Sequence, residues 1–381
     1  MGAWLLQVLQ MQYDATILTW GPVDSSVVNQ AYGTNLDPAR FRNLTVPAAP
    51  RRLLGVMPRR LDMLRSSVLS RAARRALASE HYDLVVSSMN ELDVGRHVVQ
   101  YVHFPWGKFP RPDATYQWWQ WSPPARAYRA LARSLSAFDD ARVAANTTVV
   151  NSNWTGRVFS SYYGTQGRTV YPPVLGGFAE VPFERRTDDF LLLGRIAPEK
   201  RIEDVIAILA AVRARGSALR LRIVGQVVSA RYARRIQRAV APHRAWVEML
   251  EDVPRTELVR LMSMSRYGIH GMLGEHFGIG PAELQRAGCI TFVPDYGGLV
   301  EIVADARLRY RSSDDAIDKI HRVLTDPALR ASVLAGVENR RTMFSEQRFM
   351  EEMSDVLERA LGTSARGQPA LATAPRHDLL A

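Results

Sequence analysis

Short apolar runs alternate with longer amphipathic stretches along most of this chain, and this alternation constrains the fold more than any other feature. Nearly continuous apolar strands that are separated by helices indicate parallel sheets covered on both faces. The fold class predicted is therefore α/β. The predicted strands are residues 15–20, 82–87, 97–102, 148–151, 190–194, 219–224, 267–269 and 289–293, and the clearest predicted helices are 201–215 and 229–241.

A proline- and glycine-rich segment, YPPVLGG at residues 171–177, interrupts the pattern and divides the chain. A length of 381 residues exceeds one ordinary core and suits two domains. We predict doubly wound domains at 1–174 and 175–344. We expect the amphipathic helix 345–362 to pack back on the first domain, and the tail 363–381 to be disordered because it is rich in Ala, Pro, Gly and Thr.

The net charge of +11 suggests an anionic partner, whether a membrane surface, nucleic acid or a phosphorylated substrate. The basic residues are nearly all arginine. A base-composition bias of the genome explains this preference for arginine over lysine as well as an anionic partner does, but it does not explain the excess of basic over acidic residues. The single cysteine, Cys289, excludes an intrachain disulfide and fits a reducing compartment. No run approaches the ~20 apolar residues of a membrane span, and the N-terminus lacks the pattern of a secretory signal.

The stretch GEHFGIGPAE at 274–283 places Glu275 and Glu283 on either side of a glycine-rich turn. Pro281 suits the first position of a helix, which would put Glu283 in the first helical turn. Backbone N–H groups at a helix N-terminus hold anionic oxygens, and a carboxylate can accept both hydrogen bonds of a vicinal diol. The arrangement fits a nucleotide-diphosphate sugar. An acidic residue that merely stabilises a helix N-terminus is the alternative.

A second segment, GRIAPEK at 194–200, follows a predicted strand and precedes a helix. Arg195 and Lys200 would lie at the carboxyl end of a parallel strand, where α/β sheets bind ligands and two cations can neutralise a departing diphosphate. Lysine is rare in this chain and is not interchangeable with arginine. A solvated turn is the alternative. His103 ends another predicted strand, and its residue type leaves open whether it is catalytic or a packed core residue.

Together these segments resemble the family 4 retaining glycosyltransferases, which have the GT-B fold of two facing Rossmann-like domains. The resemblance also rests on YVHFPW (101–106), NSNWT (151–155) and VYPPV (170–174), and covers about residues 3–360. More narrowly, these motifs are similar to those of GDP-mannose-dependent α-1,2-mannosyltransferases that extend a dolichyl-diphosphate-linked glycan. The resemblance implies transfer of a hexose, mannose first, from a nucleotide-diphosphate sugar to a sugar or lipid-linked glycan acceptor.

The resemblance also implies roles for the matching positions. Arg195 and Lys200 would bind the donor diphosphate, Glu275 the hexose and Glu283 the ribose hydroxyls. His103 would lie near the hexose, so His103 and Glu275 are the predicted catalytic residues. The other implied donor contacts are Phe277, Gly278 and Ile279, with Gly225 and Val253 near the base.

The implied mechanism is front-face transfer with retention, and it needs no cofactor or metal ion. The leaving phosphate oxygen can take the proton of the acceptor hydroxyl while oxocarbenium-like charge develops. The protein then contributes mainly positioning, stabilisation of the diphosphate, and exclusion of water by domain closure.

The chain departs from the family in two places. LQRAG at 284–288 replaces the small, methionine-containing turn that usually follows the second glutamate. The chain also opens on a helix-like segment, residues 3–9, where the family has a strand and a glycine-rich loop. We expect the natural start about 15–30 residues upstream, the length of such a strand and loop. An incomplete first domain is the alternative.

Residues 57–79 predict a basic amphipathic helix. Such a helix can lie on an anionic membrane surface, which suits a lipid-linked acceptor and a cytoplasmic protein at the inner face of the membrane. A solvated basic face is the alternative. We expect no nucleic-acid partner, because the basic residues lack interleaved aromatic groups. The predicted apolar stripe of this helix consists of Leu61, Leu64, Val68, Ala72 and Ala76.

Two other functions stay open. The first is a disaccharide phosphorylase or a sucrose- or trehalose-type synthase on the same fold, which would use phosphate or a soluble sugar. The second is a non-catalytic nucleotide-sugar-binding protein that partners another transferase. The motifs also leave open whether the donor carries GDP or UDP.

Overall fold

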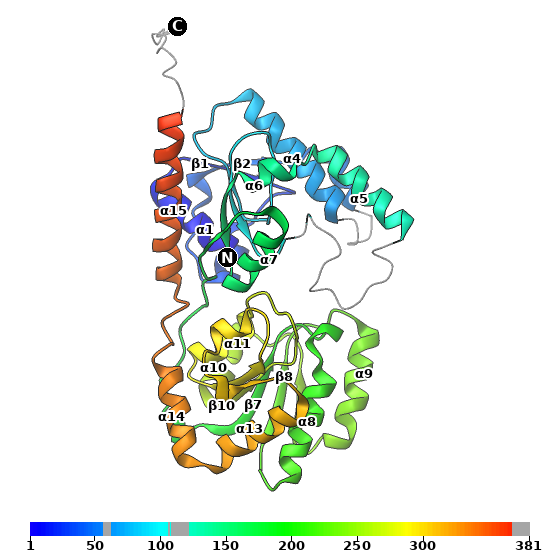
Figure 1. Ribbon diagram of the computed structural model, residues 1–381, viewed down its shortest axis with the longest axis vertical. Coiled ribbons are helices and arrows are strands. Elements are labelled where there is room, and N and C mark those ends of the chain that lie inside the picture. The colour runs from blue at the N-terminus through cyan, green and yellow to red at the C-terminus, as the bar shows by residue number, and fades with distance from the viewer. Residues whose placement is uncertain (56–61, 106, 108–121, 368–381) are drawn as a thin grey trace.

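The computed structural model describes residues 1–55, 62–105, 107 and 122–367. The chain forms two lobes, which are connected by the extended segment after residue 169 and by the C-terminal helix (Figure 1). Both lobes are built of parallel strands with helices between them, as the α/β prediction required.

The described strands of the first lobe form two separate parallel sheets. The strand β1 pairs only with β2, and the remaining strands follow the order β3-β4-β5-β6. In the larger sheet Val99 lies opposite Val86 on one side and Thr147 on the other. The strands are β1 (Ala15–Thr19), β2 (Phe41–Thr45), β3 (Val86–Ser87), β4 (Val99–Val102), β5 (Thr147–Val150) and β6 (Arg168–Thr169).

Helices connect and cover these strands. The chain reaches β1 from α1, and the long helix α4 precedes β3. The helices of this lobe are α1 (Gly2–Gln12), α2 (Ser25–Tyr32), α3 (Ala48–Gly55), α4 (Asp62–Ser79), α5 (Pro123–Ser136), α6 (Asp140–Ala144) and α7 (Asn153–Tyr163).

A partly open cavity of about 270 Å³ lies in the first lobe and is lined mainly by apolar groups. Residues of β1, of the segment 84–88 around β3, and of α1, α4 and α5 surround it. The cavity therefore lies where the two sheets of this lobe meet.

The second lobe has one continuous sheet among the described residues, in the order β12-β11-β10-β7-β8-β9. The central strand β7 ends in five consecutive buried residues, as expected for a strand covered on both faces. The strands are β7 (Thr187–Leu193), β8 (Arg220–Val224), β9 (Val247–Leu250), β10 (Ser265–Ile269), β11 (Ile290–Pro294) and β12 (Arg309–Tyr310).

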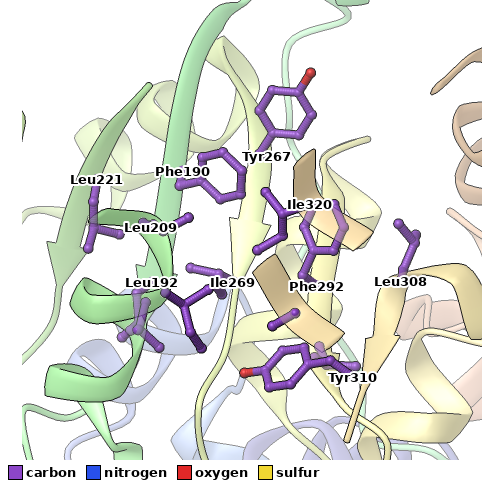
Figure 2. Packing of buried hydrophobic residues seen from close by; sticks show 14 of the residues in the cluster. Phe190, Leu192, Leu209, Leu221, Tyr267, Ile269, Phe292, Leu308, Tyr310 and Ile320 are labelled. Atoms are coloured by element: carbon purple, nitrogen blue, oxygen red, sulfur yellow. The ribbon is translucent and has the colours of Figure 1, made fainter. Parts of the chain in front are cut away.

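The core of the second lobe is packed between this sheet and its helices. Figure 2 shows Phe190 and Tyr267 side by side with Phe292 near them, and their ring planes are close to parallel. The helices are α8 (Ile202–Ala214), α9 (Ala230–Val240), α10 (Arg255–Met264), α11 (Ile279–Arg286), α12 (Leu299–Ile302), α13 (Ser313–Thr325) and α14 (Pro327–Glu338).

The last helix, α15 (Glu346–Gly367), leaves the second lobe and runs along the first (Figure 1). Its Phe349, Met353 and Leu357 are buried in one cluster with Val99 and Tyr101 of the first sheet. The helix continues five residues past the predicted end at 362. The remainder of the predicted disordered tail, residues 368–381, lies outside the described residues.

The strand predictions hold to within a few residues for the buried strands, whereas β2, β6, β9 and β12 were missed. β2 exposes most of its residues, so it lacks a continuous apolar run. Among the described side chains of α4 the buried ones are Ser67 and Ser70, while Leu64, Val68 and Ala72 of the predicted stripe are half-buried. The first part of the predicted basic helix, residues 57–61, lies outside the described residues.

Candidate functional site

Glycines allow three backbone segments to meet at the carboxyl edge of the second sheet. A Cβ atom on Gly225, which follows β8, would lie 1.8 Å from the carbonyl oxygen of Gly194, so no side chain fits there. A Cβ atom on Gly280 would lie 2.8 Å from the carbonyl oxygen of Leu193, the last residue of β7. The N-terminus of α11 therefore rests on the end of β7, beside the predicted diphosphate-binding turn.

Lys200, Glu275 and His270 form a compact charged cluster at this edge. The Lys200 Nζ lies 2.5 Å from Oε2 of Glu275, and the same oxygen is 3.0 Å from Nε2 of His270. Lys200 ends the short 3-10 turn after β7, Glu275 lies in the loop before α11, and His270 directly follows β10. Lys200 is only 9% exposed and His270 only 1%. The ion pair of Lys200 and Glu275 is thus largely shielded from water, which strengthens the attraction between the two charges.

The surroundings of Glu275 keep its carboxylate ionised. Burial alone would raise the pKa of Glu275, but the hydrogen bond from His270 and the charge of Lys200 outweigh it and hold that pKa well below its usual range. Burial lowers the pKa of His270, which favours the neutral imidazole. Nδ1 of His270 has no hydrogen-bond partner in the described part of the chain. A neutral ring that donates from Nε2 to Glu275 fits both observations.

Glu283 lies on α11 and forms an ion pair with Arg255 at the start of α10. Burial raises the pKa of the Glu283 carboxyl, and the Arg255 charge opposes this effect. The predicted start of this helix was wrong. The helix begins at Ile279, so Pro281 is its third residue and no acidic residue stands in the first turn. Proline is tolerated there because the first N–H groups of a helix have no intrahelical partner.

The loop that carries Glu275 is supported from behind by a second glycine pair. Gly298 donates its N–H to the carbonyl oxygen of Glu275 at 2.8 Å. A Cβ atom on Gly298 would lie 2.2 Å from the carbonyl oxygen of His276, and one on Gly297 would lie 2.6 Å from that of Glu275. This close backbone approach holds residues 275–277 against the start of α12.

Three aromatic rings connect this loop to the first lobe. The ring of His276 stacks on Phe104 with centroids 4.1 Å apart and planes 14° apart, and Trp154 lies nearly parallel to both rings. The hydroxyl of Ser152 donates to the carbonyl oxygen of His276 at 2.6 Å. Residues of the motifs YVHFPW, NSNWT and GEHFGIGPAE therefore meet at one interface, next to Glu275.

Glu301 of α12 forms a second contact between the lobes. Its two carboxylate oxygens accept the backbone N–H groups of Asn153 and Trp154, each at 2.8 Å. These are the first two residues of α7. The hydroxyl of Tyr171 also donates to Glu301, at 3.0 Å. A carboxylate from the second lobe thus satisfies unpaired donors at a helix N-terminus of the first, a favourable arrangement.

His103 follows β4 and its backbone N–H donates to the side chain of Asn90 at 2.7 Å. Its Nε2 lies 3.3 Å from the carbonyl oxygen of Ser88. Burial lowers the pKa of His103 to about 4, so the ring is neutral at physiological pH. The next residue, Phe104, contacts His276, and this contact places His103 close to the loop of Glu275.

The other predicted site residues are less closely grouped. Arg195 is largely exposed and pairs with Glu199 at 3.0 Å. Val253 packs against the small cluster around β8 and α10, close to Arg255 in the chain. Phe277 is buried, whereas Ile279 is 46% exposed. Trp106 of YVHFPW lies outside the described residues.

Sequence reasoning missed His270, Glu301 and Asn90. His270 directly follows β10, so its position at a carboxyl strand end was an available signal. Glu301 lies 18 residues beyond Glu283, on a four-residue helix, and nothing in its local pattern marks it. Asn90 adopts a positive φ of 69°, and its side chain accepts the N–H groups of both His103 and Phe104.

Within the described residues, no three His, Cys, Asp or Glu side chains are grouped as metal ligands would be. The expectation of a metal-independent site stays a prediction. None of the helices described here is long and apolar enough to cross a membrane.

Solved structures with this architecture define the class of fold. WaaG, "a glycosyltransferase involved in lipopolysaccharide biosynthesis", aligns with a TM-score of 0.67 at 16% identity and covers 93% of this chain and 94% of its own. Anabaena Alr3699/HepE in complex with UDP and glucose aligns with a TM-score of 0.63 at 14% identity, over 94% of this chain and 96% of its own. The chain therefore has the GT-B fold, as predicted.

The second lobe carries the family signature. Residues 178–339 match the family model described as "Glycosyl transferases group 1", and the chain thus contains a glycosyltransferase group 1 domain. The matched range holds Arg195, Lys200, Glu275 and Glu283, which the segments GRIAPEK and GEHFGIGPAE had singled out.

Curated relatives are similar to about half of this chain. The "GDP-Man:Man(3)GlcNAc(2)-PP-Dol alpha-1,2-mannosyltransferase" of Homo sapiens is 27% identical over 233 residues, which are 54% of this chain and 46% of that protein. The protein of the same name from Neurospora crassa is 25% identical over 222 residues, 52% of this chain and 40% of that protein. The chain spans less than half the length of these relatives. The similarity alone therefore does not assign their activity to this chain.

Proposed function

We propose that this protein is a retaining hexosyltransferase that moves mannose from a nucleotide-diphosphate sugar to a glycan or lipid-linked acceptor. The observation that carries the proposal is the cluster of Lys200, Glu275 and His270 at the carboxyl edge of the second sheet. This cluster places a buried cation and an ionised carboxylate beside a glycine-lined turn and a helix N-terminus. Such groups suit the diphosphate and hexose of one donor molecule.

In this proposal Lys200 changes its partner when the donor binds. Glu275 lies 2.5 Å from Lys200 and neutralises it. A diphosphate oxygen would draw the ammonium group toward itself, while His270 keeps its hydrogen bond to Glu275 and holds the carboxylate in place. Glu275 is then free to accept a hydrogen bond from a hexose hydroxyl. Arg195, which is largely exposed, is the second cation for the diphosphate.

The chemical step in this proposal is front-face transfer. The bond between the hexose anomeric carbon and the diphosphate oxygen breaks, and the acceptor oxygen attacks from the same face. The departing oxygen takes the acceptor proton, so no protein base is required. Lys200 and Arg195 stabilise the charge on the diphosphate, which removes the need for a metal ion. The neutral ring of His103 can accept a hydrogen bond from the hexose without adding charge near the developing cation.

The test measures donor binding and transfer together. The purified protein is melted with GDP-mannose, UDP-glucose, GDP, UDP and ADP, since a ligand at 100 times its Kd adds ~2.7 kcal/mol to stability. The same donors are assayed for transfer to mannosyl acceptors, with and without excess chelator. We expect GDP-selective stabilisation, chelator-resistant transfer and an α-anomeric product by NMR.

Other results would reject parts of the proposal. UDP-selective stabilisation would keep the site but change the donor. An inverted product or loss of activity with chelator would reject the retaining, metal-independent mechanism. Nucleotide binding with no transfer to any acceptor would favour a non-catalytic binding protein.

A peripheral membrane contact at the inner face of the cytoplasmic membrane also belongs to this proposal. Arg71 and Arg75 of α4 are exposed on the first lobe, as an anionic surface would require. Sedimentation with vesicles that contain anionic lipid should retain the protein, and Arg71→Glu/Arg75→Glu should release most of it. Equal retention on neutral vesicles would contradict an electrostatic contact.

A further inference from the structure

The last residue of α11, Arg286, lies where the chain crosses from one lobe to the other. The chain makes this crossing twice, in the extended segment after residue 169 and again between α14 and α15 (Figure 1). Nη1 of Arg286 donates to Oε2 of Glu346, the first residue of α15, at 2.6 Å. The other oxygen of Glu346 accepts the backbone N–H of Gly176, in the first crossing, at 2.8 Å. One arginine–carboxylate pair therefore connects both crossings to α11.

The two crossings also contact each other and the end of α11. The N–H of Val174 donates to the carbonyl oxygen of Phe344 at 2.9 Å. Arg341, in the second crossing, donates from Nε to the backbone carbonyl oxygen of Arg286 at 3.0 Å. A Cβ atom on Gly176 would lie 2.8 Å from Nη2 of Arg286, so the guanidinium lies directly against this glycine. These contacts restrict both crossings as long as Arg286 stays in place.

Partial burial distinguishes this pair from an ordinary surface ion pair. The side chains of Arg286 and Glu346 are 18% and 20% exposed. Exposed pairs contribute little because water and salt screen them, whereas partly buried pairs are screened less. Arg168 and Asp355, which join β6 to α15, are 42% and 37% exposed. Their ion pair connects α15 to the first lobe alone and therefore provides a matched control.

The opposite end of α11 belongs to the candidate site. The helix begins directly after the loop that carries Glu275, and Gly280 rests on the end of β7. A helix of eight residues spans only about 12 Å, so α11 connects the donor loop to the crossings over a short distance. Arg286 belongs to LQRAG, where the sequence departs from the family. The family resemblance therefore supplies no role for this arginine.

We propose that Arg286 is a positioning residue, which sets the angle between the two lobes and keeps the donor loop facing the first lobe. This inference rests on the proposed function, because it gives the contact with Glu346 a part in transfer. Without that contact the lobes open farther and water reaches the donor. The alternative is that Arg286 only stabilises the C-terminus of α11, where a cation is favourable. The two interpretations differ in whether the lobes move relative to each other.

The separation of the lobes can be measured without any donor. Cys289 is fully buried, so spin labels attach selectively to cysteines introduced at exposed positions. Ala130→Cys on α5 and Gln237→Cys on α9 place one label on each lobe, on the side of the molecule away from α15 (Figure 1). Pulsed electron paramagnetic resonance gives the distribution of distances between the labels. We expect a narrow distribution in the labelled parent protein, and a broader one that extends to longer distances after Arg286→Ala.

Two further variants and an assay sharpen the test. Glu346→Gln is milder, because its amide oxygen still accepts the Gly176 N–H while the charge opposite Arg286 is lost. It should broaden the distribution in the same way, and the double variant should add nothing further. The control Arg168→Ala should leave the distribution unchanged. With GDP-mannose as donor, Arg286→Ala should lower the ratio of transfer to hydrolysis several-fold, while the Kd for GDP stays close to that of the parent protein.

An unchanged distance distribution in Arg286→Ala, with or without a fall in Tm, would overturn the proposal and leave only the role at the helix end. Equal broadening in Arg168→Ala would also overturn it, since any loosening of α15 would then suffice. If the parent protein binds none of the nucleotides but Arg286→Ala still broadens the distribution, the proposed function fails. Arg286 then keeps its role in setting the angle between the lobes.

Discussion

In the second lobe the six described strands form one sheet, whereas in the first lobe the six described strands are divided between two sheets with a cavity where they meet. The residues that approach the candidate site follow the same division. Lys200, Glu275 and His270 rest on the continuous sheet of the second lobe. The first lobe reaches the site through His103 and Ser152, which follow β4 and β5. These are the two inner strands of the larger sheet of that lobe. On both sides, therefore, the site residues follow strands that lie within a hydrogen-bonded sheet.

The largest expected effect concerns the cores of the two lobes. Leu192 is fully buried in the second lobe, and Leu18 lines the cavity of the first and is half-buried. Leu192→Ala should cost ~3–5 kcal/mol, because it opens a new void in a packed core, and Leu18→Ala only ~1–2 kcal/mol, because space already exists beside it. Urea unfolding of both variants measures this. Equal costs would show that the first lobe is as tightly packed as the second.

The next effect is on activity and should be confined to the second lobe. Glu275→Ala and Lys200→Ala should each lower kcat/KM for transfer by a factor of ~10² or more, since each removes a contact to the hexose or diphosphate. Lys319→Ala and Glu257→Gln are matched controls, because both side chains form ion pairs within their own helices.

Removing one partner of the shielded pair also destabilises the protein, so each variant must be compared at a temperature well below its own Tm. Activity within a factor of ~3 of the wild type in both variants would remove Lys200 and Glu275 from the proposed site.

The sequence predicted the second lobe better than the first for a physical reason. Five consecutive buried residues in β7 make a continuous apolar run, and Gly280 of EHFGIG marks a position where two backbone segments meet. By contrast, β2 exposes most of its residues and α4 buries serines toward the cavity. A pattern of apolar residues cannot reveal an element whose buried face is polar or whose neighbour is a cavity.

The candidate site shows the same limit. Lys200, Glu275 and His103 could be singled out because each follows a predicted strand or belongs to a glycine-rich turn. Glu301 and Asn90 could not, because their roles depend on contacts with residues distant in the chain. Glu301 acts on Asn153 and Trp154, almost 150 residues away, and local spacing carries no trace of that contact.

A smaller effect should appear in the pH dependence of stability. The folded pKa of His103 is about 4, while an unfolded histidine titrates near 6.5. Between these values the unfolded chain binds a proton that the folded chain does not, so the free energy of unfolding rises with pH. Above pH 6.5 the contribution of His103 to stability is fully present. The His103 contribution lost on acidification is on the order of 3 kcal/mol. His103→Asn should therefore flatten the stability profile between about pH 4 and 6.5, measured by urea unfolding at several pH values. An unchanged slope would place the His103 ring in water.

The smallest expected effect tests whether the lobes are coupled at Glu301. Glu301→Gln keeps the shape of the side chain but replaces one acceptor oxygen with an NH2 group, which faces a backbone N–H of α7. The contact should weaken by ~1–3 kcal/mol. We expect faster amide exchange at Asn153 and Trp154, and more donor hydrolysis relative to transfer, because a more open cleft admits water. Glu338→Gln is the matched control, since Glu338 pairs with Arg341 at the surface. If exchange at α7 rises but hydrolysis does not, the Glu301 contact stabilises the interface without controlling access to the site. If neither amide exchange nor hydrolysis changes, the second lobe positions the loop that carries Glu275 independently of the first lobe.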